Sequence, residues 1–499
     1  MHRGPGEDTG DGGGCRPDRQ RVVAPRSRRC HPRAVRSGVI DRPTLVGGPM
    51  TDETRDTAAV NRRRFLAGTG TIGAAAALHA LMGNTAALAG GPGVGNNRGV
   101  VAPDNGGYGP LRPAPPHGEL LLPEGFSYVE FGRTGSPLSD GGTTPGRHDG
   151  MAAFAAADGA LRLVRNHEQS GGPAFADPHY DPAAAGGTTT VVFDREAMRP
   201  VRSFSSLAGT IRNCAGGPTP WGTWLSCEET FTGLDSDRPH GYVFEVPADA
   251  DGPVDPVPHR AMGRFTHEAV AVDPDTGIIY QTEDRGSSGL YRFVPDVPGN
   301  PGAGGRLQML AVAGHPGHDT RQGQRAGRPL PVEWVDIPDP DPDSDDSLAV
   351  FRQGRQRGGA VFARLEGAWY GDGSIFVNAT SGGDAGLGQV WQYRPTGEAG
   401  GQLILVYEST DPDLLQSPDN LCVSPNSGGL VLCEDGSGPD MLRGLTPRGE
   451  IFDLAALNSG NTSELAGATF SPDGQVLFFN VQTPGVTYAV TGPWSRGAL

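Results

Sequence analysis

The chain has 499 residues and a formal net charge of −16, from 57 acidic and 41 basic residues. Glycine (78) and proline (45) are abundant and only 36% of the residues are hydrophobic, which is typical of many short strands joined by turns and argues against long helices. The acidic balance argues against a nucleic-acid partner.

The N-terminal part of the chain has the features of an export signal. Residues 1–49 form a leader rich in Gly, Arg and Pro, and Met50, which follows it, is an alternative start of translation. Residues 50–89 are typical of a twin-arginine signal peptide: Asn61-Arg62-Arg63-Arg64-Phe65-Leu66 precedes an apolar run that ends in the cleavage site Ala87-Leu88-Ala89. The charged flanks and the cleavage site favour removal of this segment over its retention as a membrane anchor.

This signal predicts an extracytoplasmic protein, periplasmic or secreted, that meets the twin-arginine translocase during export. No other segment approaches the roughly 20 apolar residues that span a bilayer, so no permanent membrane span is expected. Residues 90–118, rich in Gly and Pro, are expected to be a linker to one domain over 119–499, which begins with a strand near 126–131.

Six copies of one short pattern follow, each with two apolar runs separated by a tight turn. The copies begin at Asp149, Cys214, Glu268, Glu366, Asn420 and Glu464. Their second runs close with Asn166-His167-Glu168, Cys227-Glu228-Glu229, Thr282-Glu283-Asp284, Asn378-Ala379-Thr380, Cys433-Glu434-Asp435 and Asn480-Val481-Gln482. Each copy predicts an antiparallel hairpin. Together they predict an all-β, six-bladed β-propeller with loop insertions, in which the polar hairpin ends meet at one face near the axis.

Two features between and within the repeats have simpler interpretations. Residues 295–346 look like a surface excursion, whose acids are expected to be solvated rather than to bind calcium. Four cysteines beyond the leader do not make a disulfide scaffold in a chain of this size. Cys422 and Cys433 flank a hairpin, where they either pair or remain buried free thiols.

Acids gathered at one face would repel each other strongly, which favours several bound metal ions over one. Calcium takes six to eight oxygen ligands, which carboxylates from several strands can supply. The candidate ligands are Glu168, Cys214, Glu228, Glu229, Glu268, Glu283, Asp284, Glu366, Asp419, Asn420, Glu434, Asp435 and Glu464. Neighbours along a strand point to opposite faces, so one acid of each adjacent pair is expected to enter the site, and the sequence leaves open which. The alternative is ordinary polarity of hairpin ends that face solvent.

Cys214 stands where other copies have an acid. A thiolate among oxygen ligands selects a transition metal such as iron or zinc. Cys227, beside Glu228, is the rival ligand, although it can equally serve as a packing residue. His167 and His267 each precede a candidate glutamate and are expected to support the site or the core rather than to bind metal.

The chain resembles the PhoX family of secreted alkaline phosphatases. The resemblance lies in residues 166–168, 213–229, 267–284, 418–421 and 464–474. It implies a six-bladed propeller with a cofactor of ferric ions, Fe(III), and calcium ions, Ca(II), and a cysteine among the iron ligands. It also implies hydrolysis of small-molecule phosphate monoesters by a metal-activated water or oxo group that attacks phosphorus. Acting through the metals, the expected catalytic residues are Cys214, Glu229, Glu283 and Glu366.

Further expectations accompany this hypothesis. The protein is expected to be a monomer, and an arginine such as Arg165 or Arg285 is expected to add positive charge at the site. Two alternatives stay open. One is a calcium-dependent propeller lactonase or phosphodiesterase, and the other is a non-catalytic propeller that calcium stabilises and that binds a partner.

Overall fold

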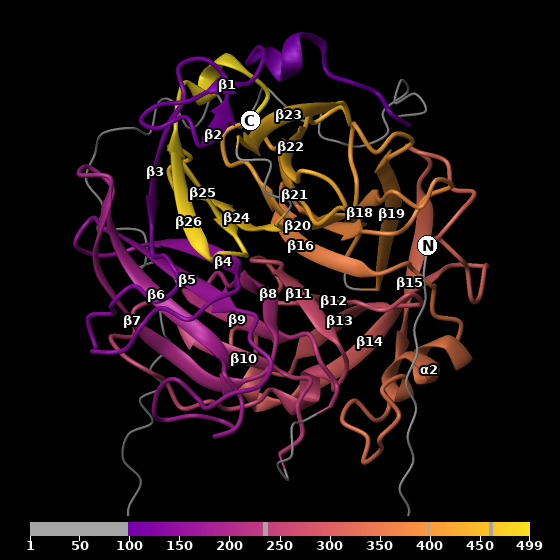
Figure 1. Ribbon diagram of the computed structural model, residues 1–499. Helices are drawn as coiled ribbons and strands as arrows, with labels where there is room; N and C mark the ends of the chain where they lie inside the picture. The colour runs from indigo at the N-terminus through magenta and orange to yellow at the C-terminus, as the bar shows by residue number, and fades with distance from the viewer. Residues whose placement is uncertain (1–97, 233–237, 398, 459–462) are drawn as a thin grey trace, which may run out of the picture. The chain divides into compact units, whose positions relative to one another are not determined.

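The computed structural model describes residues 98–232, 238–397, 399–458 and 463–499, and β-strands dominate them (Figure 1). The expected leader, the signal peptide and the first residues of the expected linker lie outside this range. Among the described residues, no helix has the length and hydropathy to cross a membrane.

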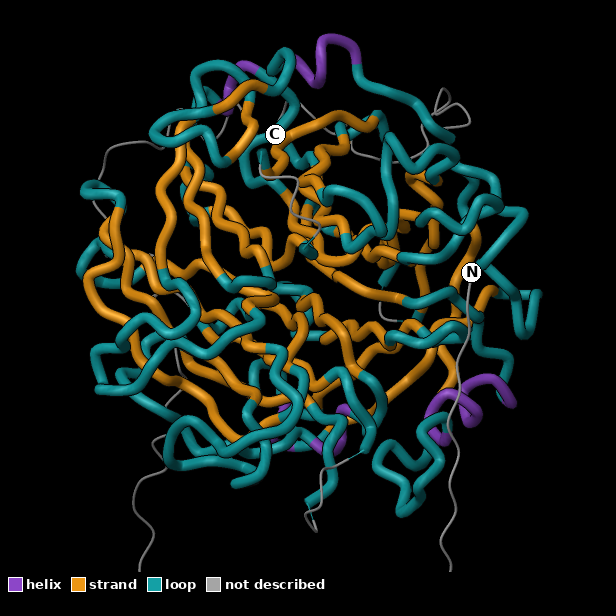
Figure 2. The backbone as a smooth tube through the Cα atoms, in the orientation of Figure 1, coloured by secondary structure: helices purple, strands orange, loops and turns teal. Residues whose placement is uncertain are grey.

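The strands form five antiparallel sheets arranged around an axis (Figures 1 and 2). One sheet contains β4 (His148–Ala155), β5 (Leu161–His167), β6 (Gly186–Asp194) and β7 (Arg199–Thr210), and the next contains β8 (Asn213–Pro218), β9 (Thr223–Glu228) and β10 (Val243–Pro247). A third contains β20 (Pro418–Val423), β21 (Leu430–Glu434), β22 (Met441–Leu445), β23 (Ile451–Leu457), β2 (Leu120–Leu122) and β1 (Arg112–Pro113). A fourth contains β24 (Leu465–Phe470), β25 (Val476–Val481), β26 (Val486–Thr491) and β3 (Ser127–Phe131).

The remaining sheet has nine strands. One half is β11 (His267–Val272), β12 (Ile279–Glu283), β13 (Leu290–Pro295) and β14 (Gly305–Val312), and the other is β16 (Leu365–Gly371), β17 (Ser374–Ala379), β18 (Gln389–Pro395) and β19 (Gly400–Glu408). The halves are joined by β15 (Leu330–Asp336), which pairs with both β14 and β19. The expectation of a surface excursion over 295–346 is therefore wrong, because this segment supplies two strands. The helix α2 (Ala349–Gln356) follows β15.

The innermost strands close a ring. Around the axis β4, β8, β11, β16, β20 and β24 contact one another in turn, and β24 contacts β4 (Figure 1). The strand β3 from the first part of the domain pairs with β26 from its last part, so segments far apart in the sequence share one sheet. The predicted all-β propeller is thereby confirmed, and the count of six blades stays a prediction.

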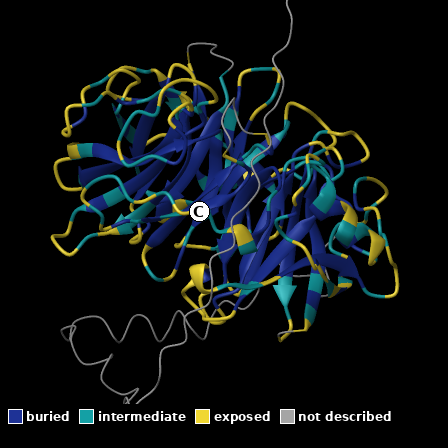
Figure 3. Cartoon of the chain, turned by 90° about the horizontal axis from the view of Figure 1, so that it is seen from below, coloured by how far each residue is buried: buried dark blue, intermediate teal, exposed yellow. Residues whose placement is uncertain are grey.

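The inner strands are buried on both faces because neighbouring sheets pack face to face, whereas exposed residues lie mostly on the loops and on outer strands such as β7 (Figure 3). Every residue of β11 and of β17 is buried, for example. Ile375, Val377 and Leu403 from one half of the nine-stranded sheet pack in a single cluster with Tyr280 and Leu310 from the other half. Burial of this apolar surface is the main term that stabilises the ring.

The described part of the expected linker, residues 98–118, is attached to the propeller. Ala102 N donates to Ile451 O at 2.8 Å, and Arg98 pairs with the buried Glu408 at 2.9 Å. Tyr108 is only 2% exposed and donates through its hydroxyl to Trp494 O. The chain therefore joins the folded domain before residue 119, earlier than the sequence predicts.

The four cysteines of the described chain are buried free thiols. Cys422 and Cys433 lie on the paired strands β20 and β21 without a disulfide between them. Of the two states left open by the sequence, the structure has the reduced one.

Candidate metal centre

Each innermost strand contains a β-bulge close to its start. In β4 the pairing register shifts between His148 and Met151, and equivalent shifts occur in β8, β11, β16 and β20, whereas the shift in β24 lies one residue later. A bulge places two residues opposite one and re-aims a side chain. In five strands the first bulge residue carries a carboxylate or a thiol: these residues are Asp149, Cys214, Glu268, Glu366 and Asp419.

A second set of side chains comes from the ends of the neighbouring strands. In each hairpin, the residue after the second strand donates its N–H to the carbonyl of the residue that precedes the innermost strand. Examples are Glu229 N to Arg212 O at 2.9 Å and Asp435 N to Ser417 O at 3.0 Å. The six residues in this position are Glu168, Glu229, Asp284, Thr380, Asp435 and Gln482. The closing register predicted from the six repeats is therefore the observed one.

Seven of the candidate ligands come together in three overlapping groups. In each group the possible ligand atoms lie within 4.8 Å of one another. The groups are Cys214, Glu229 and Glu268; Glu268, Glu366 and Asp419; and Asp419, Asp435 and Glu464. Glu268 and Asp419 each belong to two groups, so the donors form one continuous arc, called the carboxylate arc below.

The adjacent acid pairs divide in a regular way. The second member of each pair, Glu229, Asp284 or Asp435, stands beside the bulges, while the first member turns away and binds backbone amides. Glu228 accepts from Ile211 N, Gly241 N and Tyr242 N and contacts His240 Nδ1 at 2.6 Å. Glu283 accepts from Gly289 N and the Tyr291 hydroxyl, and Glu434 accepts from Gln416 N, Met441 N and Arg443 Nε. The structure thus keeps three candidate ligands, Glu228, Glu283 and Glu434, out of the arc because strand alternation points them the other way.

The strand pairing shows that the last two repeats start at other residues than the sequence predicts. Pro418 pairs with Glu434 and Leu465 with Val481, so the positions equivalent to Glu366 are Asp419 and Ala466. The starts expected at Asn420 and Glu464 are therefore shifted by one and two residues. Asn420 still lies beside the arc, where its Nδ2 donates to Asp419 Oδ1 at 3.0 Å, and Glu464 reaches the arc from the residue before β24.

Asp149 is a further acid of this site that the candidate ligands omit. It is 2% exposed, and its carboxylate contacts Gln482 Nε2 at 3.3 Å. Burial raises its pKa well above the usual value, and repulsion from Glu168 and Asp419 adds to the shift. The signal was in the sequence, since Asp149 opens the first repeat in the register of Cys214.

Three arginines lie among these acids. Arg212 pairs with both Glu168 (2.9 Å) and Glu229, Arg364 pairs with Asp284 and with Glu366 (2.7 Å), and Arg147 pairs with Glu168. All three have a left-handed backbone, with φ near 50° (50° for Arg147 and Arg212, 47° for Arg364). Non-glycine residues are rare in this region, and such strain collects at functional sites.

The acids of the site outnumber these three arginines, so their full ionisation would be strongly unfavourable without further cations. Burial raises the pKa of Glu229 to about 8, against the opposing effect of Arg212. Burial and neighbouring carboxylates raise the pKa of Asp419 to about 7 and that of Glu268 well above its usual value. Buried acids at this density are stable as anions only beside cations, and seven donors within short distances fit a cluster of metal ions.

The two arginines singled out from the sequence have different places. Arg165 is buried and donates to the Thr487 and Thr189 hydroxyls, and it forms no ion pair with a carboxylate of the described chain. Burial lowers its pKa to about 9. Arg285 instead lines a groove beside Glu229 and Asp284, with its Nε 3.2 Å from the Thr266 hydroxyl.

The family model of the alkaline phosphatase PhoX matches residues 106–485, which include every residue of the carboxylate arc. The chain belongs to the PhoX family. The resemblance drawn from the sequence is confirmed, and with it the expected function, metal-dependent hydrolysis of phosphate monoesters.

The fold of this PhoX family member is similar to that of a solved PhoX structure. PhoX of Pseudomonas fluorescens, solved with vanadate, a transition state analogue, is 17% identical with a TM-score of 0.60, over 78% of this chain and 98% of that chain. A gluconolactonase from Xanthomonas campestris is 14% identical with a TM-score of 0.36, over 77% and 98% of the two chains. No curated protein sequence matches.

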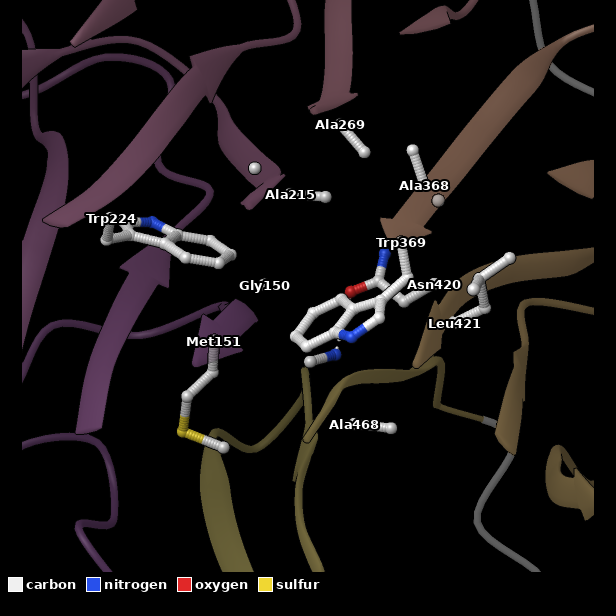
Figure 4. A pocket seen from close by; sticks show the side chains of 13 residues that line it. Gly150, Met151, Ala215, Trp224, Ala269, Ala368, Trp369, Asn420, Leu421 and Ala468 are labelled. Atoms are coloured by element: carbon white, nitrogen blue, oxygen red, sulfur yellow. Dashed lines mark hydrogen bonds between the residues drawn. The ribbon is translucent and has the colours of Figure 1, made fainter. Parts of the chain in front are cut away.

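Between the bulges, a narrow space at the axis of this PhoX family member is lined mainly by small residues and by two tryptophans (Figure 4). Gly150, Ala215 and Ala269 come from three successive innermost strands, and Trp369 lies in their midst. Trp369 packs against hydrophobic clusters from several sides of the ring. The axis is therefore mostly filled, and a groove lined by Arg285 reaches Glu229 at one end of the arc.

Proposed function

We propose that this PhoX family member hydrolyses small-molecule phosphate monoesters at a mixed iron and calcium centre held by the carboxylate arc. The observation that carries the proposal is the overlap of three donor groups, one of which contains a thiol. Cys214, Glu229 and Glu268 offer one sulfur and two carboxylates, a set that suits iron. The other two groups offer only oxygen donors, which suit calcium.

Further side chains complete the proposed centre. Asp149, Glu168 and Asp284 stand beside the arc and supply additional oxygen atoms, which a calcium ion needs because it takes six to eight. Bound metal ions supply Lewis-acid chemistry, since they offset the charge of the phosphate group. Glu283, expected among the catalytic residues, is replaced in this proposal by Asp284.

The protein's own residues hold the carboxylates in place. Arg212 bridges Glu168 and Glu229, and Arg364 bridges Asp284 and Glu366, so each arginine fixes two acids from different strands. The groove beside Arg285 accepts the leaving group, because it is the side on which Glu229 and Asp284 are open. Its hydroxyl and guanidinium groups favour a polar leaving group.

Two properties of the whole chain belong to the same proposal. A six-bladed interpretation of the propeller is supported by the six bulged innermost strands, of which two share the nine-stranded sheet through β15. Export by the twin-arginine route is supported by the sequence of residues 50–89. A folded, metal-loaded monomer outside the cytoplasm is therefore the proposed active form.

The substrate class is tested with full-length protein exported natively and purified without chelator. We expect hydrolysis of p-nitrophenyl phosphate, much slower hydrolysis of bis(p-nitrophenyl) phosphate and none of a gluconolactone. Chelator is expected to abolish the activity. Preference for the diester or the lactone would support the alternative hydrolases, and absence of turnover with all three substrates would support a binding propeller.

A further inference from the structure

A recurring hydrogen bond crosses the junctions between neighbouring innermost strands. The donor is the side chain one residue before the end of a hairpin's second strand. The acceptor is the carbonyl of the first bulge residue in the neighbouring innermost strand. Asn166 in β5 donates through Nδ2 to Cys214 O at 3.0 Å in β8, and Thr282 in β12 donates through Oγ1 to Glu366 O at 2.6 Å in β16. The donor and the acceptor belong to different sheets or to different halves of the nine-stranded sheet.

The same bond occurs at two more junctions. Asn378 in β17 donates through Nδ2 to Asp419 O at 2.7 Å in β20, and Asn480 in β25 donates to Asp149 O at 2.5 Å in β4. All four acceptor carbonyls belong to first bulge residues, whose side chains enter the site. No donor of the four carries a charge or touches the possible ligand atoms of the arc.

These bonds satisfy groups that the strand pairing leaves without a partner. A bulged residue loses its place in the hydrogen-bond ladder. The four donor side chains are 0% exposed, so solvent does not substitute for them. An unpaired buried carbonyl would be costly, and the side-chain donor therefore fixes the direction of the bulge.

The remaining two junctions have a cysteine, Cys227 or Cys433, at the donor position. There the crossing contact comes from residues at the bulge itself. Cys214 Sγ lies 3.5 Å from Glu268 O, and Asn420 Oδ1 accepts from Gly467 N at 2.7 Å. Each of the six junctions thus has a crossing contact, and at four of them the donor is an uncharged side chain near the end of a strand.

Close packing between neighbouring bulges also restricts their backbone conformation. A Cβ at Gly367 would lie 2.7 Å from Asp419 O, and one at Gly150 would lie 2.6 Å from the Cα of Ala215. Both distances are too short for a real side chain, so neighbouring bulges touch through their backbones. A small change in the direction of one carbonyl therefore moves the side chain that leaves the same residue.

We propose that Asn166, Thr282, Asn378 and Asn480 are positioning residues of the metal centre. Each fixes the backbone of the next bulge and so aims a ligand at the arc. The inference rests on the proposed function, because it takes Glu366 and Asp419 as metal ligands. Substitution of a group that orients a metal ligand typically lowers metal affinity by roughly 10- to 100-fold.

The test compares Thr282→Val with Thr282→Ser in the full chain. Valine keeps the shape but removes both the donor to Glu366 O and the acceptor of Ala269 N in the bulge of β11, whereas serine keeps the hydroxyl that makes both bonds. The matched control is Thr320→Val, because Thr320 is also 0% exposed and its hydroxyl also donates to a backbone carbonyl, Val361 O at 2.8 Å, away from the arc. The readouts are the calcium affinity of chelator-treated protein by titration calorimetry and the melting temperature with and without calcium.

We expect Thr282→Val to weaken calcium binding roughly 10- to 100-fold, with Thr282→Ser close to wild type. Thr320→Val is expected to lower the melting temperature without changing calcium affinity. Wild-type affinity in Thr282→Val, or an equal loss in Thr320→Val, would overturn the inference. If Thr282→Val does not fold, Asn378→Val against Asn378→Thr gives the same comparison. A wild-type protein that binds no calcium would instead overturn the proposed function.

Discussion

Arg364 binds Asp284 through two parallel hydrogen bonds, Nε to Oδ1 at 2.8 Å and Nη2 to Oδ2 at 3.0 Å. The same guanidinium reaches Glu366 at 2.7 Å, so one side chain connects an acid of a strand end with an acid of a bulge. A planar guanidinium can make this arrangement, and a lysine ammonium cannot.

Arg364→Lys is therefore expected to lower metal affinity and kcat/KM roughly 10-fold or more, because both carboxylates lose a fixed partner. The measurement is calcium titration together with p-nitrophenyl phosphate kinetics. Arg321→Lys is the control, since Arg321 makes a similar two-point pair with Asp319 at the surface. Equal effects of the two substitutions would contradict a special role for Arg364.

Neighbouring acids Glu228 and Glu229 are expected to respond in opposite ways. Glu228→Gln removes an acceptor of three backbone amides and is expected to reduce the free energy of unfolding by about 1–3 kcal/mol. Glu229→Gln removes a proposed ligand, so it should abolish most turnover while the metal-free protein stays as stable as wild type or becomes more stable. Thermal melts of chelated protein and phosphatase assays separate the two effects. The assignment of the pair would be reversed if Glu228→Gln lost metal and Glu229→Gln lost stability.

Stability of the chelated protein is expected to fall as the pH rises from about 5 to 8. Burial raises the pKa of Glu229 to about 8 and that of Asp419 to about 7, above the unfolded values near 4. An acid with a raised pKa binds more protons when folded, so its contribution to stability is present at low pH and is lost as the pH rises through this range. Calcium should remove this trend, because the metal replaces the protons. Melting temperatures measured at several pH values, with chelator and with calcium, give the comparison, and a chelated protein that becomes more stable toward pH 8 would contradict it.

Much of the fold could be predicted from the sequence, because a hairpin depends on a short turn and the two runs beside it. Turns such as Asp473-Gly474 fix the two runs around them, and the closing residues Glu168, Glu229 and Asp435 all hold the predicted register. The strands β14 and β15 were missed because the turn-rich sequence of 295–346 hides a pairing that reaches β19, far along the chain.

The site was harder to predict because its geometry depends on bulges. A bulge adds a residue to one strand, so counting from the turn misplaces the bulged strand while the opposite strand stays correct. This is why one start fell on Asn420 instead of Asp419. The start expected at Glu464 lies two residues before Ala466, a displacement away from the turn that the bulge does not explain. The choice between Glu228 and Glu229 depends on which face the last paired residue presents, and only the ladder itself decides that.

The central claim, a thiol-containing metal centre at the propeller axis, is tested most directly by elemental analysis. Wild type, Cys214→Ala and Cys227→Ala are exported natively, purified without chelator and analysed for iron and calcium. We expect iron and calcium in wild type and in Cys227→Ala, and loss of iron in Cys214→Ala, because Cys214 alone of the two thiols joins the arc. Calcium without iron in the wild type, or iron retained by Cys214→Ala, would contradict the account.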